Sequence, residues 1–500
     1  MQGQYQNVLS FLPPPKWVRV VRSKRKEAFE YGNLRMDIDW PDLCELDSAT
    51  LLAAYKSRHL SPVDVVRAAL DRCTKVQDAL NAFTYIDFDG ALTAAKASEK
   101  RWRNGKPLSL IDGIPTTLKD IFHVEGWSVR YGSMTTPGTP SNQDAPSVSR
   151  LREAGAVFIG QTAAPEYSWK TVTDSPAFGV TRNPWDPTCT PGGSSGGAAV
   201  AAACGAGVLH LGTDGGGSIR IPASFTGVFG LKPSHGRVPV YPPSSFGTVA
   251  HIGPITRTVA DAAAMLGVLS GRDLRDWTQP PMAFPNVSLA PFTWRGKRIG
   301  YWRTPCIGNV DGQVATAIEA TLVGLEAAGA SVTEMRLPYQ DELLEMYNRH
   351  WYIGAANLLT SISTRNHANL DPGLVRAAIV GRRYSGVERL EAEVWRNRYG
   401  SAMDNLLSDF DFIMSPSVPI LPFEVGRDVP RSSDAKSWTE WCSFSFPINL
   451  SQQPACSVPC GLSKEGLPIG LQIIGSRGAD SDVLSAALCY ERAFPDRLIR

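Results

Sequence analysis

Residues 190–233, TPGGSSGGAAVAAACGAGVLHLGTDGGGSIRIPASFTGVFGLKP, form the stretch on which the fold assignment depends. Two clusters of Gly and Ser occur in it, at residues 192–197 and 212–218, and an alanine-rich stretch that is expected to be helical, 198–203, separates them. Consecutive glycines lose more conformational entropy on folding than other residues. They are useful where backbone N–H groups must surround an anion or an oxyanion, because side chains would block that approach.

Two common glycine-rich motifs do not fit this segment. It contains neither the Gly-x4-Gly-Lys-Ser/Thr pattern of a phosphate-binding loop nor the Gly-x-Gly-x-x-Gly pattern of a dinucleotide site. Residues 192–196 match the Gly-x-Ser-x-Gly elbow of α/β-hydrolases, but that motif must follow a strand. The preceding residues 183–191 contain three prolines, which a central strand does not tolerate.

The remaining interpretation is a hydrolase whose general base is a lysine. The seven histidines form no recognisable catalytic pattern. His210 lies in an apolar run and is expected to be a hydrogen-bonded core residue. His123 and His235 lie nearer the unusual segments and are kept as alternative participants.

Hydrophobic periodicity along the chain predicts alternating helices and strands. This alternation favours an α/β fold with a large sheet sandwiched between helices on both faces. Because no repeat or long linker interrupts residues 41–500, we expect one catalytic domain there. The expected helices are 62–73, 90–102, 147–154, 261–269 and 314–329, and the expected strands are 111–120, 156–160, 297–302 and 330–335.

Composition excludes several classes of protein. With 43% apolar and 20% charged residues, the 500-residue chain is neither disordered, collagenous nor a coiled coil. The apolar stretch 198–212 is too short to span a bilayer, and no secretory leader is recognisable, so we expect no membrane association. The nine cysteines form no Cys-x-x-Cys pair, so we expect no disulfide framework, no metal site, no cofactor and a cytoplasmic location.

The N-terminal residues differ from the rest in charge. Residues 1–35 carry seven basic and two acidic residues. Such an arm can contact nucleic acid or serve as a transit peptide, but this one is short, poor in Ser and interrupted by Pro13–Pro15. We expect residues 1–40 to be a poorly ordered or peripheral extension, with Met36 as an alternative start.

Six motifs occur in one order along the chain. They are Gly113-Ile114-Pro115 with Lys119-Asp120, residues 191–197, residues 212–220, residues 230–238, residues 253–257 and residues 459–472. Together they resemble the amidase signature enzymes, and the resemblance extends from about residue 45 to the C-terminus. It implies the amidase signature fold and an amide hydrolase.

The resemblance also implies a Ser–Ser–Lys triad. Ser218 would be the nucleophile that forms an acyl-enzyme, and Lys119 would be the base. Ser194, preceded by a cis peptide bond, would stand between them. The oxyanion hole would be formed by the backbone N–H groups of Gly215, Gly216, Gly217 and Ser218.

A lysine base requires an unusual environment. An exposed lysine titrates near 10.4, so neutralising it at pH 7.4 costs roughly 4 kcal/mol, and burial lowers the pKa by disfavouring the ammonium. Lys119 lies near the end of an apolar strand between Leu118 and Asp120, and a regular strand directs Asp120 to the other face. Asp214 and Arg220 are expected to pair and brace the glycine turn rather than to take part in the reaction.

Two departures from the family pattern bear on the site. Gly215 stands where many relatives carry a larger residue, which should make the oxyanion hole more flexible or the site wider. Ile121 follows Lys119-Asp120 where subunits of tRNA-dependent amidotransferases commonly carry asparagine.

The expected substrate is a small-molecule amide. Trp169 and Trp441 are predicted to line the acyl pocket, and aromatic walls favour an aryl or hydrophobic acyl group. The expected products are a carboxylic acid and ammonia or an amine. The alternatives are a glutaminase-type subunit of a tRNA-dependent amidotransferase and a hydrazide, ester or ureido hydrolase of the same family. No nucleic acid partner is expected, and a homodimer is possible.

Overall fold

A computed structural model describes residues 42–431 and 433–497. The predicted N-terminal extension and Met36 lie outside the described residues, so the division between an extension and a catalytic domain stays a prediction. None of the described helices is both long and apolar enough to cross a membrane.

The described residues contain one large mixed sheet of 11 strands. Its strand order is β1-β3-β2-β6-β8-β7-β12-β13-β11-β9-β10. The strands are β1 (Phe83–Ile86), β2 (Pro115–Lys119), β3 (Val157–Thr162), β6 (Leu209–Asp214), β7 (Phe229–Lys232), β8 (His251–Thr256), β9 (Arg298–Trp302), β10 (Ser331–Met335), β11 (Phe412–Pro416), β12 (Ala455–Leu462) and β13 (Pro468–Ile474). A separate two-stranded ribbon is formed by β4 (Asp174–Ser175) and β5 (Gly179–Val180).

Helices surround this sheet. They are α1 (Ser48–Ser57), α2 (Pro62–Leu80), α3 (Phe88–Arg103), α4 (Pro146–Glu153), α5 (Gly196–Ala203), α6 (Arg220–Thr226), α7 (Val259–Leu269), α8 (Gly312–Ala327), α9 (Leu343–Thr360), α10 (Pro372–Gly381), α11 (Gly386–Asp409), α12 (Trp438–Trp441), α13 (Phe446–Ser451) and α14 (Asp480–Ala493). Every residue of β2, β3, β8 and β13 is buried, which requires cover on both faces of the sheet. The predicted α/β class is therefore confirmed.

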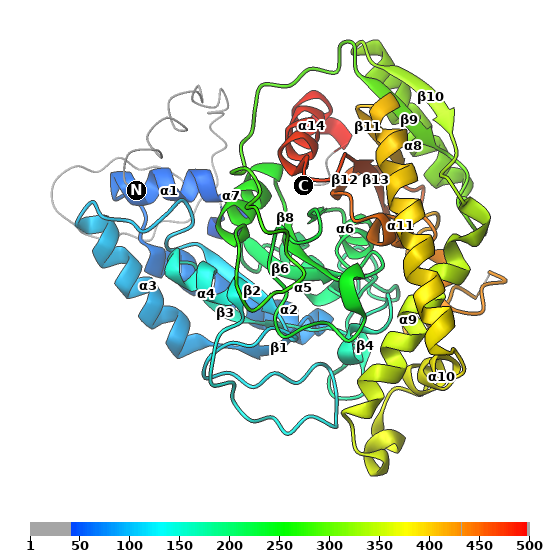
Figure 1. Cartoon of the computed structure of the whole chain (residues 1–500). Helices are drawn as coiled ribbons and strands as arrows, with labels where there is room; N and C mark the ends of the chain where they lie inside the picture. Colours follow the sequence, from blue (N-terminus) through cyan, green and yellow to red (C-terminus); the bar gives the residue numbers. More distant parts are fainter. Residues whose placement is uncertain (1–41, 432, 498–500) are drawn as a thin grey trace. The chain divides into compact units, whose positions relative to one another are not determined.

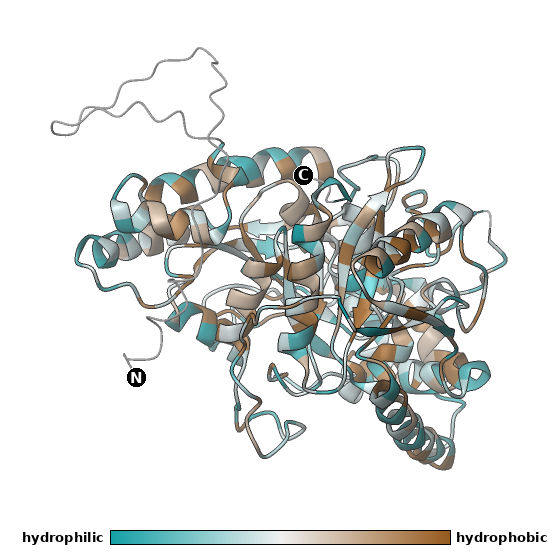
Figure 2. Ribbon diagram, turned by 90° about the horizontal axis from the view of Figure 1, so that it is seen from above, coloured by the Kyte–Doolittle hydropathy of each residue, from teal (hydrophilic) through white to brown (hydrophobic). Residues whose placement is uncertain are grey.

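The figures show how these elements are distributed. In Figure 1, β1–β3 with α3 and α4 lie on one side of β6 and β8, and β9 and β10 with α8 and α11 lie on the other. Figure 2 shows that the outer helices carry both hydrophilic and hydrophobic residues along their length, as helices with one face on a core must.

Local signals explain most element boundaries. Helix α2 begins at the predicted Pro62, where the Ser61 hydroxyl accepts the Val63 N–H, and it extends to Leu80 because Asn81 ends it in a left-handed conformation. The strand predicted over 111–120 is shorter than expected. It begins only at Pro115 because Gly113, with φ +87°, forms a turn before it.

Candidate active site

The sheet brings Lys119 next to the second glycine cluster. Strands β2 and β6 are parallel, with Leu118 opposite Leu211, so both strands end at the same edge of the sheet. Lys119 is the last residue of β2, and Thr213 and Asp214 end β6. The loop that carries Ser218 starts from this edge.

The Lys119 ammonium or amine group is completely buried among hydroxyl groups. Its Nζ lies 2.7 Å from Ser194 Oγ, 2.9 Å from Thr213 Oγ1 and 3.1 Å from Ser195 Oγ. Ser195 donates its own hydroxyl hydrogen to the Thr213 carbonyl, so Ser195 Oγ must accept from Lys119.

This set of partners suits a neutral amine. A neutral lysine has two N–H hydrogens and one lone pair. Ser195 and Thr213 can accept the two hydrogens, which leaves the lone pair for the hydroxyl hydrogen of Ser194. In that neutral state, the Lys119–Ser194 contact would have the orientation that a general base requires.

Electrostatics favour the same state. Burial lowers the pKa of Lys119 well below its ordinary value of 10.5, and the negative charge of Asp214 opposes this shift. The predicted desolvation of Lys119 is confirmed. The residue after Lys119 is Asp120, whose carboxylate does not contact the Lys119 amine. It accepts hydrogen bonds from the backbone N–H groups of Arg130 and Gly132 instead.

Ser194 and Ser218 come from neighbouring loops. The Gly193–Ser194 peptide bond is cis, as the resemblance implied. Ser195 N–H donates to the Ser218 carbonyl at 3.1 Å, which ties the two loops together. Ser218 is 3% exposed, and its Oγ makes no hydrogen bond to another described residue. A hydroxyl in this state is available to an incoming substrate.

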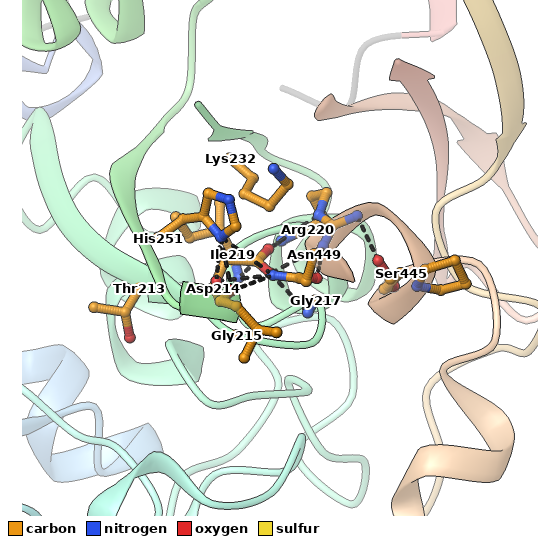
Figure 3. A network of polar contacts seen from close by, with 12 residues as sticks. Thr213, Asp214, Gly215, Gly217, Ile219, Arg220, Lys232, His251, Ser445 and Asn449 are labelled. Atoms are coloured by element: carbon orange, nitrogen blue, oxygen red, sulfur yellow. Dashed lines mark hydrogen bonds and ion pairs between the residues drawn. The ribbon is translucent and has the colours of Figure 1, made fainter. Parts of the chain in front are cut away.

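Asp214 and Arg220 form the predicted structural pair. The Arg220 guanidinium contacts both carboxylate oxygens of Asp214, at 2.9 and 3.0 Å, and neither side chain is exposed. Asn449 donates to the Asp214 carboxylate at 2.9 Å, and Arg220 donates to the Gln472 side chain at 2.7 Å. Figure 3 shows Asp214, Arg220 and Asn449 converging beside the glycine turn. Arg220 holds the pKa of Asp214 below its ordinary range despite burial.

This pair changes the predicted composition of the oxyanion hole. The Gly217 N–H donates to Asp214 Oδ1 at 2.7 Å, so it is occupied within the protein. Glycine is needed at position 217 for the conformation and close packing of the backbone. Its φ is +123°, and a Cβ there would lie 2.5 Å from Ser445 Cβ. Among described residues, the N–H groups of Gly215, Gly216 and Ser218 donate to no protein atom, so of the four predicted donors only Gly217 is occupied.

The expectation that Gly215 makes the site wider is wrong, while a more flexible oxyanion hole stays a prediction. A Cβ on Gly215 would lie 3.0 Å from Trp351 Cζ3, so the indole already fills the space that a larger residue would use. The Gly215 carbonyl also accepts a hydrogen bond from Tyr347 Oη at 3.1 Å. The loop is packed from α9 rather than left loose.

The two predicted pocket tryptophans occupy different positions. Trp169 lines a cavity of about 180 Å³, whose wall also contains the aromatic side chains of Tyr352 and Trp438 and the polar side chains of Arg376, Asp428, Lys436 and Ser437. Trp438 also packs near Gly216, so the cavity adjoins the glycine turn across one indole ring. Trp441 is 3% exposed and stacks on Phe225, with ring centroids 6.1 Å apart. Trp441 is therefore part of the hydrophobic core. Substrate contact by Trp169 or Trp441 stays a prediction.

The histidines lie away from the Lys119 contacts. His210 is fully buried and bonds Thr117 Oγ1 through Nδ1, at 2.8 Å, while its Nε2 has no described partner. His210 is thus a core residue with a hydrogen bond on only one of its two ring nitrogens. Burial lowers its pKa to about 3. His123 contacts the Tyr131 hydroxyl, and His235 lies edge-on to His251.

Three groups of the site were not predicted from the sequence. Thr213 contacts Lys119, Asn449 braces Asp214, and Tyr347 contacts the glycine turn. Thr213 could have been found, because it lies inside the quoted motif on the strand that neighbours Lys119. Asn449 and Tyr347 lie more than 100 residues from the turn and have no motif around them. No group of three or more potential metal-ligating side chains occurs within the described ranges.

Replacing Arg220 with methionine is expected to lower the free energy of unfolding by about 3–5 kcal/mol, because the Asp214 carboxylate would be left buried without its partner. Arg303→Met is the control. It removes an ion pair with Glu319 in which the side chains are 54% and 44% exposed, and such pairs contribute about 1 kcal/mol or less. Urea unfolding of both variants measures the difference. Equal losses would contradict the structural role of Arg220.

Comparison with known proteins places this site in context. A family model described as Amidase matches residues 64–484. A glutamyl-tRNA(Gln) amidotransferase subunit of Myxococcus xanthus is 35% identical, with 90% of this chain and 97% of the relative covered. An acylamidase of Rhodococcus erythropolis is 31% identical, with 90% and 96% covered.

Two solved structures show the same relationship in three dimensions. A bacterial aryl acylamidase of the amidase signature enzymes family superposes with a TM-score of 0.84 at 30% identity, covering 90% of this chain and 96% of that one. The glutamyl-tRNA(Gln) amidotransferase subunit from Thermotoga maritima gives a TM-score of 0.74 at 28% identity, covering 91% and 95%. The residues that the family model matches include the whole of the Lys119 and Ser218 site.

Proposed function

Because this chain belongs to the amidase signature family and has its fold, we propose that it hydrolyses a carboxamide C–N bond through an acyl-enzyme on Ser218. The observation that carries the proposal is the buried Lys119 Nζ, 2.7 Å from Ser194 Oγ, with its other two contacts on hydroxyl oxygens. A serine hydroxyl needs such a base, since it is a weak nucleophile on its own.

The proposed first half-reaction moves one proton along the three groups. Ser218 Oγ attacks the amide carbon, its proton passes to Ser194 Oγ, and the Ser194 proton passes to the Lys119 lone pair. The carbonyl oxygen becomes an oxyanion, which the unpartnered N–H groups of Gly215, Gly216 and Ser218 are available to stabilise. The short Lys119–Ser194 contact supports the second transfer. The hydrogen bond from the Ser195 N–H to the Ser218 carbonyl keeps the two loops adjacent, which the first transfer requires.

Collapse of this intermediate needs the proton to return. The C–N bond breaks as Lys119, through Ser194, protonates the leaving nitrogen, because an unprotonated amide anion is a poor leaving group. Water then attacks the acyl-enzyme, and its proton passes through Ser194 to Lys119. The acyl C–Oγ bond breaks as the same relay returns that proton to Ser218 Oγ. The products are a carboxylic acid and ammonia or an amine. Base and acid are both supplied by side chains of the chain itself.

The proposed acyl group is aryl or hydrophobic. The support is the cavity with three aromatic side chains in its wall, Trp169, Tyr352 and Trp438, because aromatic surfaces bind apolar groups. Its wall also contains Arg376, Asp428 and Lys436, and the Trp438 ring separates it from the glycine turn. The similarity to an aryl acylamidase points the same way. We propose a cytoplasmic enzyme acting on a small-molecule amide, as a monomer or homodimer, without nucleic acid or membrane partners.

A substrate panel tests this proposal. An N-acyl-4-nitroanilide with an aromatic acyl group is expected to give a kcat/KM at least about tenfold above that for glutamine, since an apolar pocket discriminates by about 1–3 kcal/mol. Release of 4-nitroaniline or ammonia is the measurement. A preference for glutamine would contradict the aryl assignment.

The second candidate function is the glutaminase-type subunit of a tRNA-dependent amidotransferase. The 35% identity to the Myxococcus xanthus protein favours it, and Ile121 in place of the common asparagine disfavours it. Glutamine hydrolysis that requires partner subunits would identify this function. Hydrazides, esters and ureido compounds belong in the same panel, because one acyl-enzyme serves them all.

A further inference from the structure

Tyr347 extends from α9 onto the turn that carries the nucleophile. Its Oη donates to the Gly215 carbonyl at 3.1 Å, across 132 residues of sequence. The fit is close: a Cβ on Gly216 would lie 2.2 Å from Tyr347 Oη. Glycine at this position is therefore required by the tyrosine hydroxyl.

The tyrosine itself is rigidly held. It is fully buried and stacks on Phe446 and Trp351, with centroid distances of 4.7 and 5.6 Å. Burial raises the pKa of the Tyr347 phenol well above its ordinary value of 10.0. The hydroxyl therefore keeps its hydrogen and acts as a donor to the turn.

A hydrogen bond to the Gly215 carbonyl also sets the direction of the next N–H. In a planar trans peptide the C=O of Gly215 and the N–H of Gly216 point in opposite directions. A carbonyl directed at Tyr347 thus directs the Gly216 N–H away from α9. That N–H has no partner among the described residues, whereas the Gly217 N–H is bonded to Asp214.

We propose that Tyr347 is a positioning residue of the oxyanion hole, which fixes the Gly215–Gly216 peptide so that the Gly216 N–H faces the developing oxyanion. The inference rests on the proposed function and adds to it a residue outside the family motifs. Asp214 secures the other side of the turn through Gly217. The hydrogen bonds to the Gly215 carbonyl and from the Gly217 N–H thus hold the Gly215–Gly216 peptide in one orientation.

The next turn of α9 reinforces this arrangement. Trp351 follows Tyr347 by four residues, so both side chains lie on one face of the helix. The Trp351 ring fills the space beside Gly215, and its Nε1 donates to the Trp169 carbonyl at 2.9 Å. Helix α9 therefore links the glycine turn to the segment that carries the predicted pocket wall.

The test is Tyr347→Phe, which removes the hydroxyl and keeps the stacked ring. With an amide that the enzyme hydrolyses, we expect kcat to fall about tenfold and KM to change less than about twofold, because the lost interaction acts on the transition state. A trifluoromethyl ketone, which forms an oxyanion with the catalytic serine, should lose affinity in parallel with kcat/KM. Affinity for the carboxylic acid product should stay the same.

Tyr399→Phe is the matched control. Tyr399 is equally buried in the same aromatic core, stacked on Trp395, but no contact joins it to the glycine turn. This variant should keep the wild-type kcat and trifluoromethyl ketone affinity. Thermal unfolding and active-site titration with a fluorophosphonate correct both variants for folded, reactive protein.

Two outcomes would overturn the inference. One is a wild-type kcat in Tyr347→Phe. The other is a loss that Tyr399→Phe shares, or that leaves ketone affinity unchanged, because a structural effect would then explain it. Failure of the proposed function gives a different result, in which Ser218→Ala retains the activity of the wild-type enzyme.

Discussion

Ser218→Ala is expected to lower kcat by about 10⁵-fold or more, because no acyl-enzyme can form without the nucleophile. The hydroxyl of Ser218 makes no hydrogen bond to another described residue, so its removal leaves no buried partner unsatisfied. The variant should fold normally. The measurement is turnover of the best amide from the panel, with fluorophosphonate labelling of the wild type located by mass spectrometry.

Ser443→Ala is the control for this experiment. Ser443 is buried and its Oγ also lacks a described partner, but it lies outside the glycine clusters. It should keep wild-type turnover and labelling. Measurable turnover by Ser218→Ala, or a label on another residue, would assign the nucleophile elsewhere.

Lys119→Met is expected to lower kcat by about 10³–10⁴-fold, because general base and general acid functions are lost together. The wild-type rate should also depend on pH in a definite direction. Burial favours the neutral amine, which is the active form, so the rate rises as pH increases through the pKa of Lys119. That rise lies well below pH 10.5 and should be absent in the variant.

Lys232→Met is the control that distinguishes the proposed base function of Lys119 from a general effect of removing a buried lysine. Lys232 is also fully buried with a lowered pKa, but its Nζ contacts the backbone carbonyls of Pro233 and Gln453 instead of the serines. The variant is expected to lose stability and to keep the pH-dependent rise in rate per folded molecule. If Lys119→Met retains the same rise, the base is another group.

Much of the site could be predicted because its chemistry lies in contiguous motifs. Lys119 ends a short strand, and Ser194 and Ser218 lie in glycine-rich turns whose composition already indicates exposed backbone N–H groups. Asp214 and Arg220 are six residues apart, so their pairing is a local property. The helices predicted over 62–73 and 90–102, observed as Pro62–Leu80 and Phe88–Arg103, could be predicted for the same reason, since the signals that start them lie beside them in the sequence.

Other features depended on distant segments. The strand order, with β7 between β8 and β12, cannot be derived from local patterns. Gly217 was predicted as an oxyanion donor, but its N–H is bonded to Asp214. Gly215 was expected to open the site, but Trp351, more than 100 residues away, occupies that space.

The amino-acid order alone therefore determined which reactive groups the protein has and which short elements carry them. The tertiary structure decided which of these groups are buried away from water and which backbone N–H groups have no hydrogen-bond partner among the described residues. The physical reason is that periodicity, capping and turn chemistry act over a few residues. Desolvation of Lys119 and the hydrogen bond from Tyr347 to Gly215 arise only when segments 75 to 132 residues apart pack together.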